Sequence, residues 1–197
     1  MGVAPRRRQG LASSDSHGQP LDAQSLAQLG QRRWAQAAEM AAWLTQDALS
    51  QLSLEQVLAL YRAAGGRRVA EFAANPIAEV RDSLDFLLYD NVTLEGRFAE
   101  CAAEDGAYKL AGAGKEFVSY CLCLRDPSLF APWRSYTEQA LRQLDLYPPA
   151  LRRGHLGLRY LDLLEALQTV MRRHGLADFR AADDFCYAIA RVKATQN

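Results

Sequence analysis

Apolar side chains recur every three or four positions along most of this chain, from residue 21 onward. Trp34 and Ala38 fall at this spacing, and Leu163 and Leu167 repeat it near the other end. Such a stripe is typical of an amphipathic α-helix with one buried face. No alternation of period two is long enough to predict a sheet, so the pattern predicts an all-α fold.

Capping residues and glycines divide the pattern into separate helices. Ser53 precedes a helix as an N-cap with Gln56 in the capping-box position, and Gly175 is placed to end a helix. The first helical stretch could divide at Gly30. We expect helices over about 22–50, 53–64, 67–74, 76–89, 93–104, 116–124, 135–144, 156–174 and 181–193.

The composition favours one helical domain over residues 21–197, with a sub-boundary near 105–108 at Asp105-Gly106. Residues 1–20 are rich in Gly, Ser, Arg, Gln and Pro, and we expect them to be disordered. Their arginines are followed by no apolar run, so they do not resemble a signal peptide. No apolar stretch approaches the roughly 18 residues that cross a bilayer. We therefore expect a cytoplasmic protein without a membrane partner.

The charge and the cysteine content narrow the range of protein classes to which this chain could belong. The formal net charge is zero, which gives no general attraction to nucleic acid or membrane. Residues 107–197 hold thirteen Lys and Arg against nine Asp and Glu, so an anion would bind to this half in preference to the other. The alternative is that the imbalance is a chance feature of a solvated surface. The four cysteines lie within apolar helical patterns, and we expect buried free thiols.

The segment around Gly112-Ala113-Gly114 carries the clearest candidate chemistry. A turn with Gly-x-Gly between two helices predicts a helix-hairpin-helix, in which Gly112 and Gly114 let backbone N–H groups approach a phosphate and Lys115 adds charge. Arg152 and Arg153 are further candidates for phosphate contact, with a solvated surface as the default interpretation. The alternative is a plain glycine turn between packed helices. A Walker A loop does not fit, because Lys109 stands where its first glycine belongs.

No catalytic residues, metal ligands or cofactor site emerge from the sequence. The three histidines form no ligand set, and His174 suits a cation at a helix end. Asp183-Asp184 are best explained as first-turn residues of the last helix. A DNA glycosylase would need an aspartate near Trp133-Arg134, and Asp126 instead resembles a helix stop before Pro127. We therefore expect no enzymatic activity, with a glycosylase as a distant alternative.

Trp133, Arg134 and Tyr136 are candidate anchors for a protein partner. Trp, Tyr and Arg dominate interface hot spots, and these three stand near a predicted loop. The competing interpretation is that Trp133 closes the core between two helices.

Several short segments also share an order and spacing across more than half of the chain. They are Asn75-Pro76, Val80-Arg81-Asp82-Ser83-Leu84, Leu87-Leu88-Tyr89, Leu94-Glu95-Gly96-Arg97-Phe98, Tyr108 to Ser119, Asp126 to Trp133, Thr137 to Leu141 and Asp183 to Tyr187. Together they resemble a helical region of restriction-type AAA ATPases and other prokaryotic defence proteins. This chain departs from that pattern because it carries no ATPase or nuclease domain.

The resemblance implies an accessory subunit of a bacterial defence or DNA-processing complex. Such a subunit would contact nucleic-acid backbone, DNA or RNA, and would work with a larger ATPase or nuclease subunit. The alternative is a pure protein–protein adaptor without nucleic-acid contact.

Overall fold

A computed structural model describes residues 13–14, 20–21, 23–152 and 154–192 of the chain. Two short strands, β1 (Ser13–Ser14) and β2 (Pro20–Leu21), pair antiparallel before the first helix. The helices are α1 (Ala23–Arg33), α2 (Ala37–Trp43), α3 (Gln46–Leu49), α4 (Leu54–Ala63), α5 (Val69–Ala73), α6 (Ile77–Tyr89), α7 (Leu94–Ala102), α8 (Lys115–Arg125), α9 (Ser135–Gln143), α10 (Leu156–His174) and α11 (Phe179–Val192), with a 3-10 turn η1 (Pro149–Arg152). The prediction of an all-α fold is confirmed.

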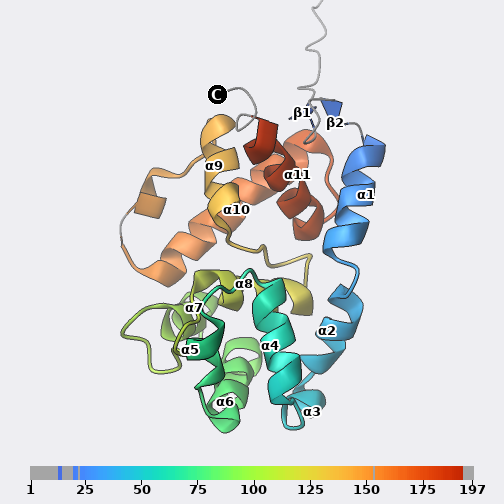
Figure 1. The fold of residues 1–197 in the computed structure, drawn as a ribbon. Helices are drawn as coiled ribbons and strands as arrows, with labels where there is room; N and C mark the ends of the chain where they lie inside the picture. The colour runs from blue at the N-terminus through green and yellow to red at the C-terminus, as the bar shows by residue number, and fades with distance from the viewer. Residues whose placement is uncertain (1–12, 15–19, 22, 153, 193–197) are drawn as a thin grey trace, which may run out of the picture.

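The helices form two groups (Figure 1), and the most extensive packing between them is that of α7 against α10. α2, α4, α6 and α7 pack against α8 in one group, while α1, α9 and α10 surround α11 in the other. All side chains of α8 from Phe117 to Leu124 are buried, as befits a helix covered from all sides. None of the described helices is long and apolar enough to cross a membrane.

An aromatic stack joins the two groups. The ring centroids of Phe98 on α7 and Tyr160 on α10 lie 4.1 Å apart, and the Trp133 ring stacks beside both. The Tyr160 hydroxyl donates a hydrogen bond to the Ala131 carbonyl at 2.8 Å. Trp133 is 0% exposed. The prediction of an exposed Trp133 anchor is therefore wrong, because this side chain completes the core between the helices.

Several helix ends were predicted well and others were not. The Ser53–Gln56 capping box is present at the start of α4, and Gly175 ends α10 in the left-handed conformation. The long first stretch, however, is three helices, and Gly30 lies inside α1. Its first break falls at Trp34, whose N–H still bonds to the Gly30 carbonyl.

The segment before α8 differs from the predicted helix–turn–helix. α7 ends at Ala102, and residues 103–114 form turns and extended backbone. The sub-boundary expected near 105–108 falls in this loop. No helix therefore leads directly into Gly112, although α8 does begin directly after Gly114.

Most of residues 1–20, which the composition predicts to be disordered, lie outside the described residues. Within this segment the structure describes β1, which lies beside α11, and Pro20 of β2.

Candidate anion-binding pocket

A pocket of about 490 Å³ lies where the turn after α4, the loop before α8 and the start of α9 meet. Ligand pockets commonly span about 300–1,000 Å³. It is lined by Tyr61, Ala64, Gly65, Gly66, Arg67, Arg68, Gly112, Gly114, Glu116, Phe117, Arg134, Ser135 and Tyr136. The pocket thus unites two predicted nucleic-acid residues, Gly112 and Gly114, with two predicted partner residues, Arg134 and Tyr136.

Gly112 is held against the start of α5. Its φ of +74° is in the left-handed region, and a Cβ there would come within 2.9 Å of the Phe72 nitrogen. The Tyr61 hydroxyl donates to the Gly112 carbonyl at 2.8 Å and accepts the Arg68 N–H at 3.2 Å. The Asn75 side chain makes two further hydrogen bonds with the Ala111 backbone. The turn is therefore rigidly positioned, and glycine at 112 has a structural reason.

Two helix N-termini open into the pocket. α8 begins after Gly114 without any side-chain cap, and α9 begins after Arg134, whose side chain has no acceptor. The first backbone N–H groups of both helices, at Lys115, Glu116 and the α9 residues Ser135 and Tyr136, have no hydrogen-bond partner in the described part of the chain. Free N–H groups and the helix dipole both favour an anion at such an end.

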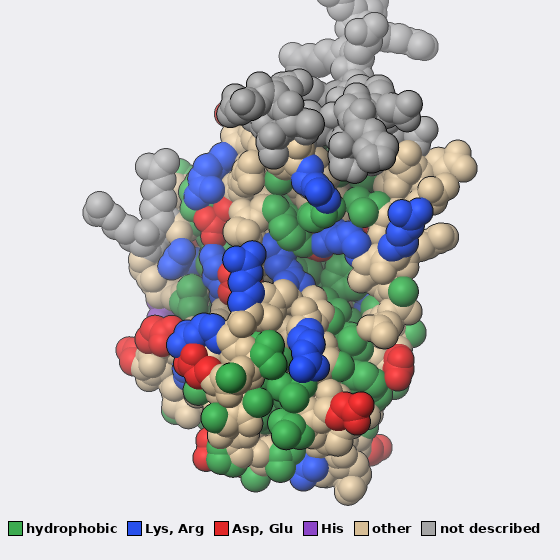
Figure 2. All heavy atoms as spheres, viewed as in Figure 1, with side chains coloured by type: hydrophobic (Ala, Val, Ile, Leu, Met, Phe, Trp, Pro, Cys, Tyr) green, Lys and Arg blue, Asp and Glu red, His purple; other side chains and the backbone are tan. Residues whose placement is uncertain are grey.

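Arginines add positive charge to the pocket. Arg67 and Arg134 form no ion pair with any described residue, and Arg68 pairs with the exposed Glu71. The guanidinium of Arg134 lies over the Tyr120 ring and donates to the Ala63 carbonyl at 3.2 Å. Figure 2 shows Lys and Arg side chains gathered across the middle of this face.

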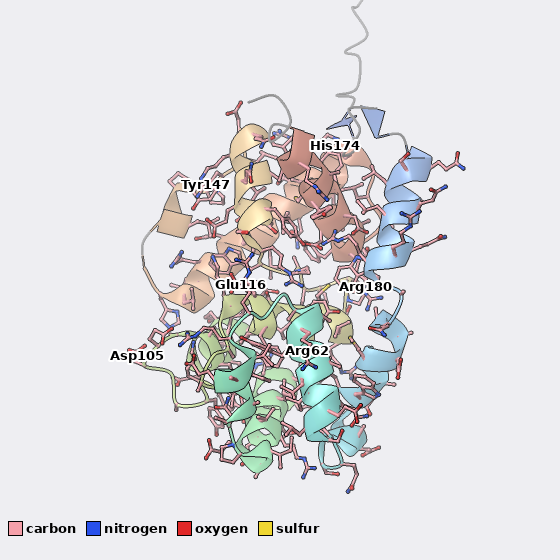
Figure 3. All side chains as sticks on the ribbon, in the orientation of Figure 1. Arg62, Asp105, Glu116, Tyr147, His174 and Arg180 are labelled. Atoms are coloured by element: carbon pink, nitrogen blue, oxygen red, sulfur yellow. The ribbon has the colours of Figure 1, made fainter. Side chains whose placement is uncertain are left out.

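One carboxylate also lines the pocket, that of Glu116, which Figure 3 labels at the start of α8. Three arginines against one carboxylate give the pocket a positive charge, and the helix ends add to it.

Lys115 does not face this pocket. Its ammonium pairs with a Glu138 carboxylate oxygen at 2.6 Å and lies 4.2 Å from the centre of the Trp133 ring. The Trp133 indole N–H donates to the same Glu138 oxygen at 2.8 Å. Burial favours protonation of Glu138, but the bonds from Lys115, Trp133 and Arg142 outweigh it and lower its pKa. Lys115 thus joins α8 to α9, and the direct phosphate contact expected of it stays a prediction.

The phosphate contacts expected of Arg152 and Arg153 stay predictions. Arg152 ends η1, and Arg153 lies outside the described residues.

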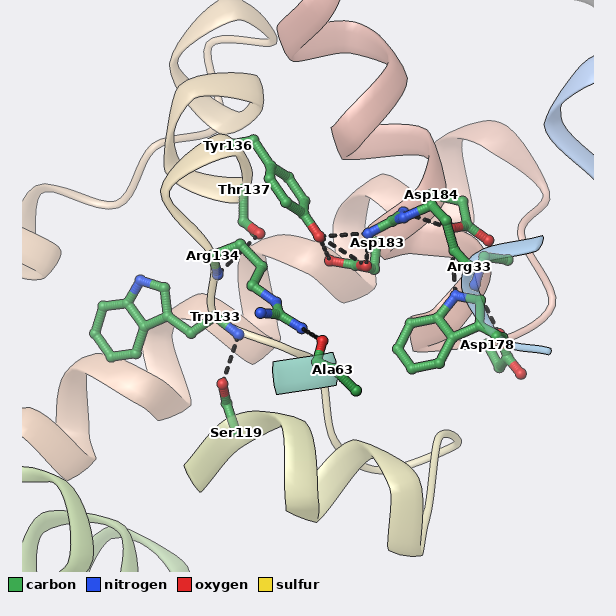
Figure 4. A network of polar contacts seen from close by, with 12 residues as sticks. Arg33, Ala63, Ser119, Trp133, Arg134, Tyr136, Thr137, Asp178, Asp183 and Asp184 are labelled. Carbon is green, nitrogen blue, oxygen red and sulfur yellow. Dashed lines mark hydrogen bonds and ion pairs between the residues drawn. The ribbon is translucent and has the colours of Figure 1, made fainter. Parts of the chain in front are cut away.

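A second polar cluster, missed in the sequence, lies behind the pocket. Arg33 on α1 pairs with Asp183 at 2.6 Å and with Asp184, while the Tyr136 hydroxyl bonds to Asp183 at 2.9 Å (Figure 4). Asp183 is 2% exposed and Asp184 6%. Burial raises the pKa of both carboxyls, that of Asp184 to about 6, against the attraction of Arg33.

The predicted first-turn role of Asp183-Asp184 is wrong, because α11 begins earlier than expected. It starts at Phe179, and Asp178 accepts the Ala181 N–H at 2.8 Å. The two carboxylates therefore lie in the second turn and are buried.

The cysteines and His174 are further titratable side chains that the sequence analysis considered. All four cysteines are buried free thiols, as predicted, and burial raises the pKa of Cys101 to about 12. Burial and Arg173 lower the pKa of His174, so the predicted helix-end cation is neutral near pH 7. Among the described residues, no three His, Cys, Asp or Glu side chains are grouped to hold a metal ion.

Asp126 behaves as the sequence predicted. It accepts hydrogen bonds from the N–H and hydroxyl of Ser128, which lower its pKa, and it ends α8.

Neither a family model, nor a curated protein, nor a solved structure matches this chain.

Proposed function

We propose that this protein binds the phosphate backbone of a nucleic acid in the pocket around Gly112 and Gly114, as a non-catalytic subunit. The observation that carries the proposal is the convergence of two helix N-termini, each with free first-turn backbone N–H groups, with Arg67, Arg68 and Arg134 on one pocket. Backbone N–H groups and the paired N–H groups of arginine guanidiniums are the hydrogen-bond donors that phosphate oxygens prefer.

The recognition would be independent of sequence. Contacts to phosphates position a protein on nucleic acid, whereas contacts to base edges specify sequence. With a formal net charge of zero, binding would depend on this local concentration of charge and would be weak for the chain alone.

The wider role follows from the resemblance to helical regions of restriction-type AAA ATPases. A larger ATPase or nuclease subunit of a bacterial defence or DNA-processing complex would supply the activity that this chain lacks. The exposed face around the pocket would then hold nucleic acid while the partner acts on it.

The test is binding of labelled single- and double-stranded DNA of two unrelated sequences, followed by fluorescence anisotropy between about 50 and 200 mM salt. The double variant Arg67→Ala/Arg68→Ala should weaken binding to all four ligands. A plot of the logarithm of its binding constant against the logarithm of the salt concentration should have a slope that is shallower by about two units. Each lost phosphate contact removes about one unit of this slope.

The matched control is Arg172→Ala/Arg173→Ala, which removes the same charge from the exposed end of α10. Equal losses of affinity in both double variants would reflect net charge alone and would exclude the pocket as the binding site. No binding by the intact protein, together with capture of an ATPase or nuclease from the native cell, would favour the adaptor role.

A further inference from the structure

A second pocket, of about 640 Å³, lies between α1 and the turn that joins α10 to α11. Figure 3 labels His174 and Arg180, which line it from before and after this turn. Its apolar wall comes from Leu26, Trp34, Leu176 and Phe185. The wall is large enough to cover an aromatic or branched aliphatic group.

A carboxylate oxygen is available at this pocket. Asp184 uses Oδ1 to accept the Trp34 indole N–H at 3.2 Å and the Arg33 guanidinium. Its Oδ2 has no partner among the described residues, and a Cβ on Gly30 would come within 2.6 Å of it. Glycine at position 30 therefore leaves space for this oxygen, which a Cβ would otherwise displace.

A cation lies on the same face of α11, one turn earlier. Arg180 and Asp184 are four residues apart and both line the pocket. The Arg180 guanidinium lies over the Trp34 ring and makes a long bond of 3.4 Å to the Leu124 carbonyl. It forms no ion pair with a described carboxylate, and its Nε is buried without a hydrogen-bond partner.

We propose that this pocket binds a small zwitterion with an apolar side chain, of the class of a hydrophobic α-amino acid. Asp184 would accept the ammonium group, Arg180 would bind the carboxylate, and the apolar wall would cover the side chain. The local charges balance in number, because the two cations Arg33 and Arg180 match the two carboxylates Asp183 and Asp184. A ligand that is neutral overall but carries separated charges complements such a site.

The test uses three probes that differ in one charged group: phenylalanine, phenethylamine without the carboxylate, and 3-phenylpropionate without the ammonium. Binding is followed on the intact protein by the NMR resonance of the Trp34 indole N–H, which bonds to Asp184. We expect phenylalanine to shift this resonance and to bind at least about tenfold more tightly than either relative, because each lacks one hydrogen bond between charged groups.

Asp184→Asn keeps an acceptor for Trp34 and should cost phenylalanine about tenfold in affinity while sparing 3-phenylpropionate. Arg180→Gln should do the reverse, sparing phenethylamine. Glu165→Gln, on the exposed side of α10, is the matched control and should change nothing. Equal binding of the three probes, no shift at Trp34, or unchanged affinity in a folded Asp184→Asn protein would each overturn the proposal.

Discussion

The Tyr136 hydroxyl bonds to both carboxylate oxygens of Asp183, at 2.9 and 3.0 Å, and so connects the anion-binding pocket to the interior of α11. Tyr136 also lines that pocket. Arg33 extends the connection from Asp183 to Asp184 at the second pocket. A single polar network thus fixes α1, α9 and α11 relative to one another beside both candidate sites.

Arg33→Ala should strongly destabilise the protein. Asp183 and Asp184 would lose their ion-pair partner while remaining buried, and breaking such a pair from one side costs about 3–5 kcal/mol. The measurement is the free energy of unfolding in urea at pH 7. Arg32→Ala, next to it on the exposed side of α1, should change that free energy by less than about 0.5 kcal/mol. Similar losses in both variants would contradict a buried network.

Part of the protein's stability should fall as pH rises from about 4 to about 6. The pKa of Asp184 is about 6 in the folded state, above its value of about 3.9 in an unfolded chain. The folded protein therefore binds more protons across this window, and deprotonation favours unfolding. Asp183, with its raised pKa, acts in the same direction.

The measurement is the unfolding free energy of the native protein minus that of Asp184→Asn, at several pH values from 4 to 7. Taking this difference removes groups of opposite sign, such as Glu138, whose lowered pKa makes its contribution vanish as pH falls. We expect the difference to decline with rising pH. A flat or rising difference would show that Arg33 keeps Asp184 ionised throughout.

The two glycines of the turn should respond differently to alanine. Gly112→Ala should cost about 1–3 kcal/mol, because residue 112 has a positive φ and its Cβ would meet the backbone at Phe72. Gly114→Ala should be tolerated, since that backbone is extended and the nearest atom is a flexible Glu116 oxygen at 3.4 Å. Thermal unfolding of both variants checks this; a more severe effect at 114 would contradict the described turn.

Local signals account for what the sequence revealed of the fold. Ser53 with Gln56, and Gly175, act through neighbouring backbone groups, so they could be recognised without knowledge of packing.

The break at Trp34 carries no glycine or proline. The helical pattern continues there through residues that favour helix. The chain turns at this point, where the Trp34 ring stacks on the Tyr120 ring and packs against the hydrophobic core.

The candidate site could be predicted only in part from the sequence, because packing brings together residues that are far apart in the chain. Gly112 and Gly114 predicted a turn, but Arg67 and Arg68 come from the segment before α5, more than forty residues earlier, and Arg134 comes from the start of α9, twenty residues later. Gly65-Gly66-Arg67-Arg68 repeats the combination of glycines followed by cations and could have been singled out. Asp183 lies one helical turn after buried Phe179, and this acidic position on an apolar face was the available signal for the network.

Lys115→Ala should separate the folding role of this residue from phosphate binding. Lys115 lies at the first turn of α8, where the sequence predicts a direct phosphate contact, but its ammonium pairs with Glu138 and covers the Trp133 ring. The substitution should lower the free energy of unfolding by about 1 kcal/mol, because Glu138 is half-buried and keeps its bonds to Trp133 and Arg142.

The salt dependence of DNA binding should then be unchanged in Lys115→Ala, since no phosphate contact is lost. Arg67→Ala is the matched comparison: Arg67 is exposed, lines the pocket and forms no ion pair with a described residue, so its loss should make the dependence shallower by about one unit. Both variants are measured by anisotropy at temperatures well below their melting points. A shallower dependence in Lys115→Ala would mean that the ammonium leaves Glu138 for the phosphate when nucleic acid binds.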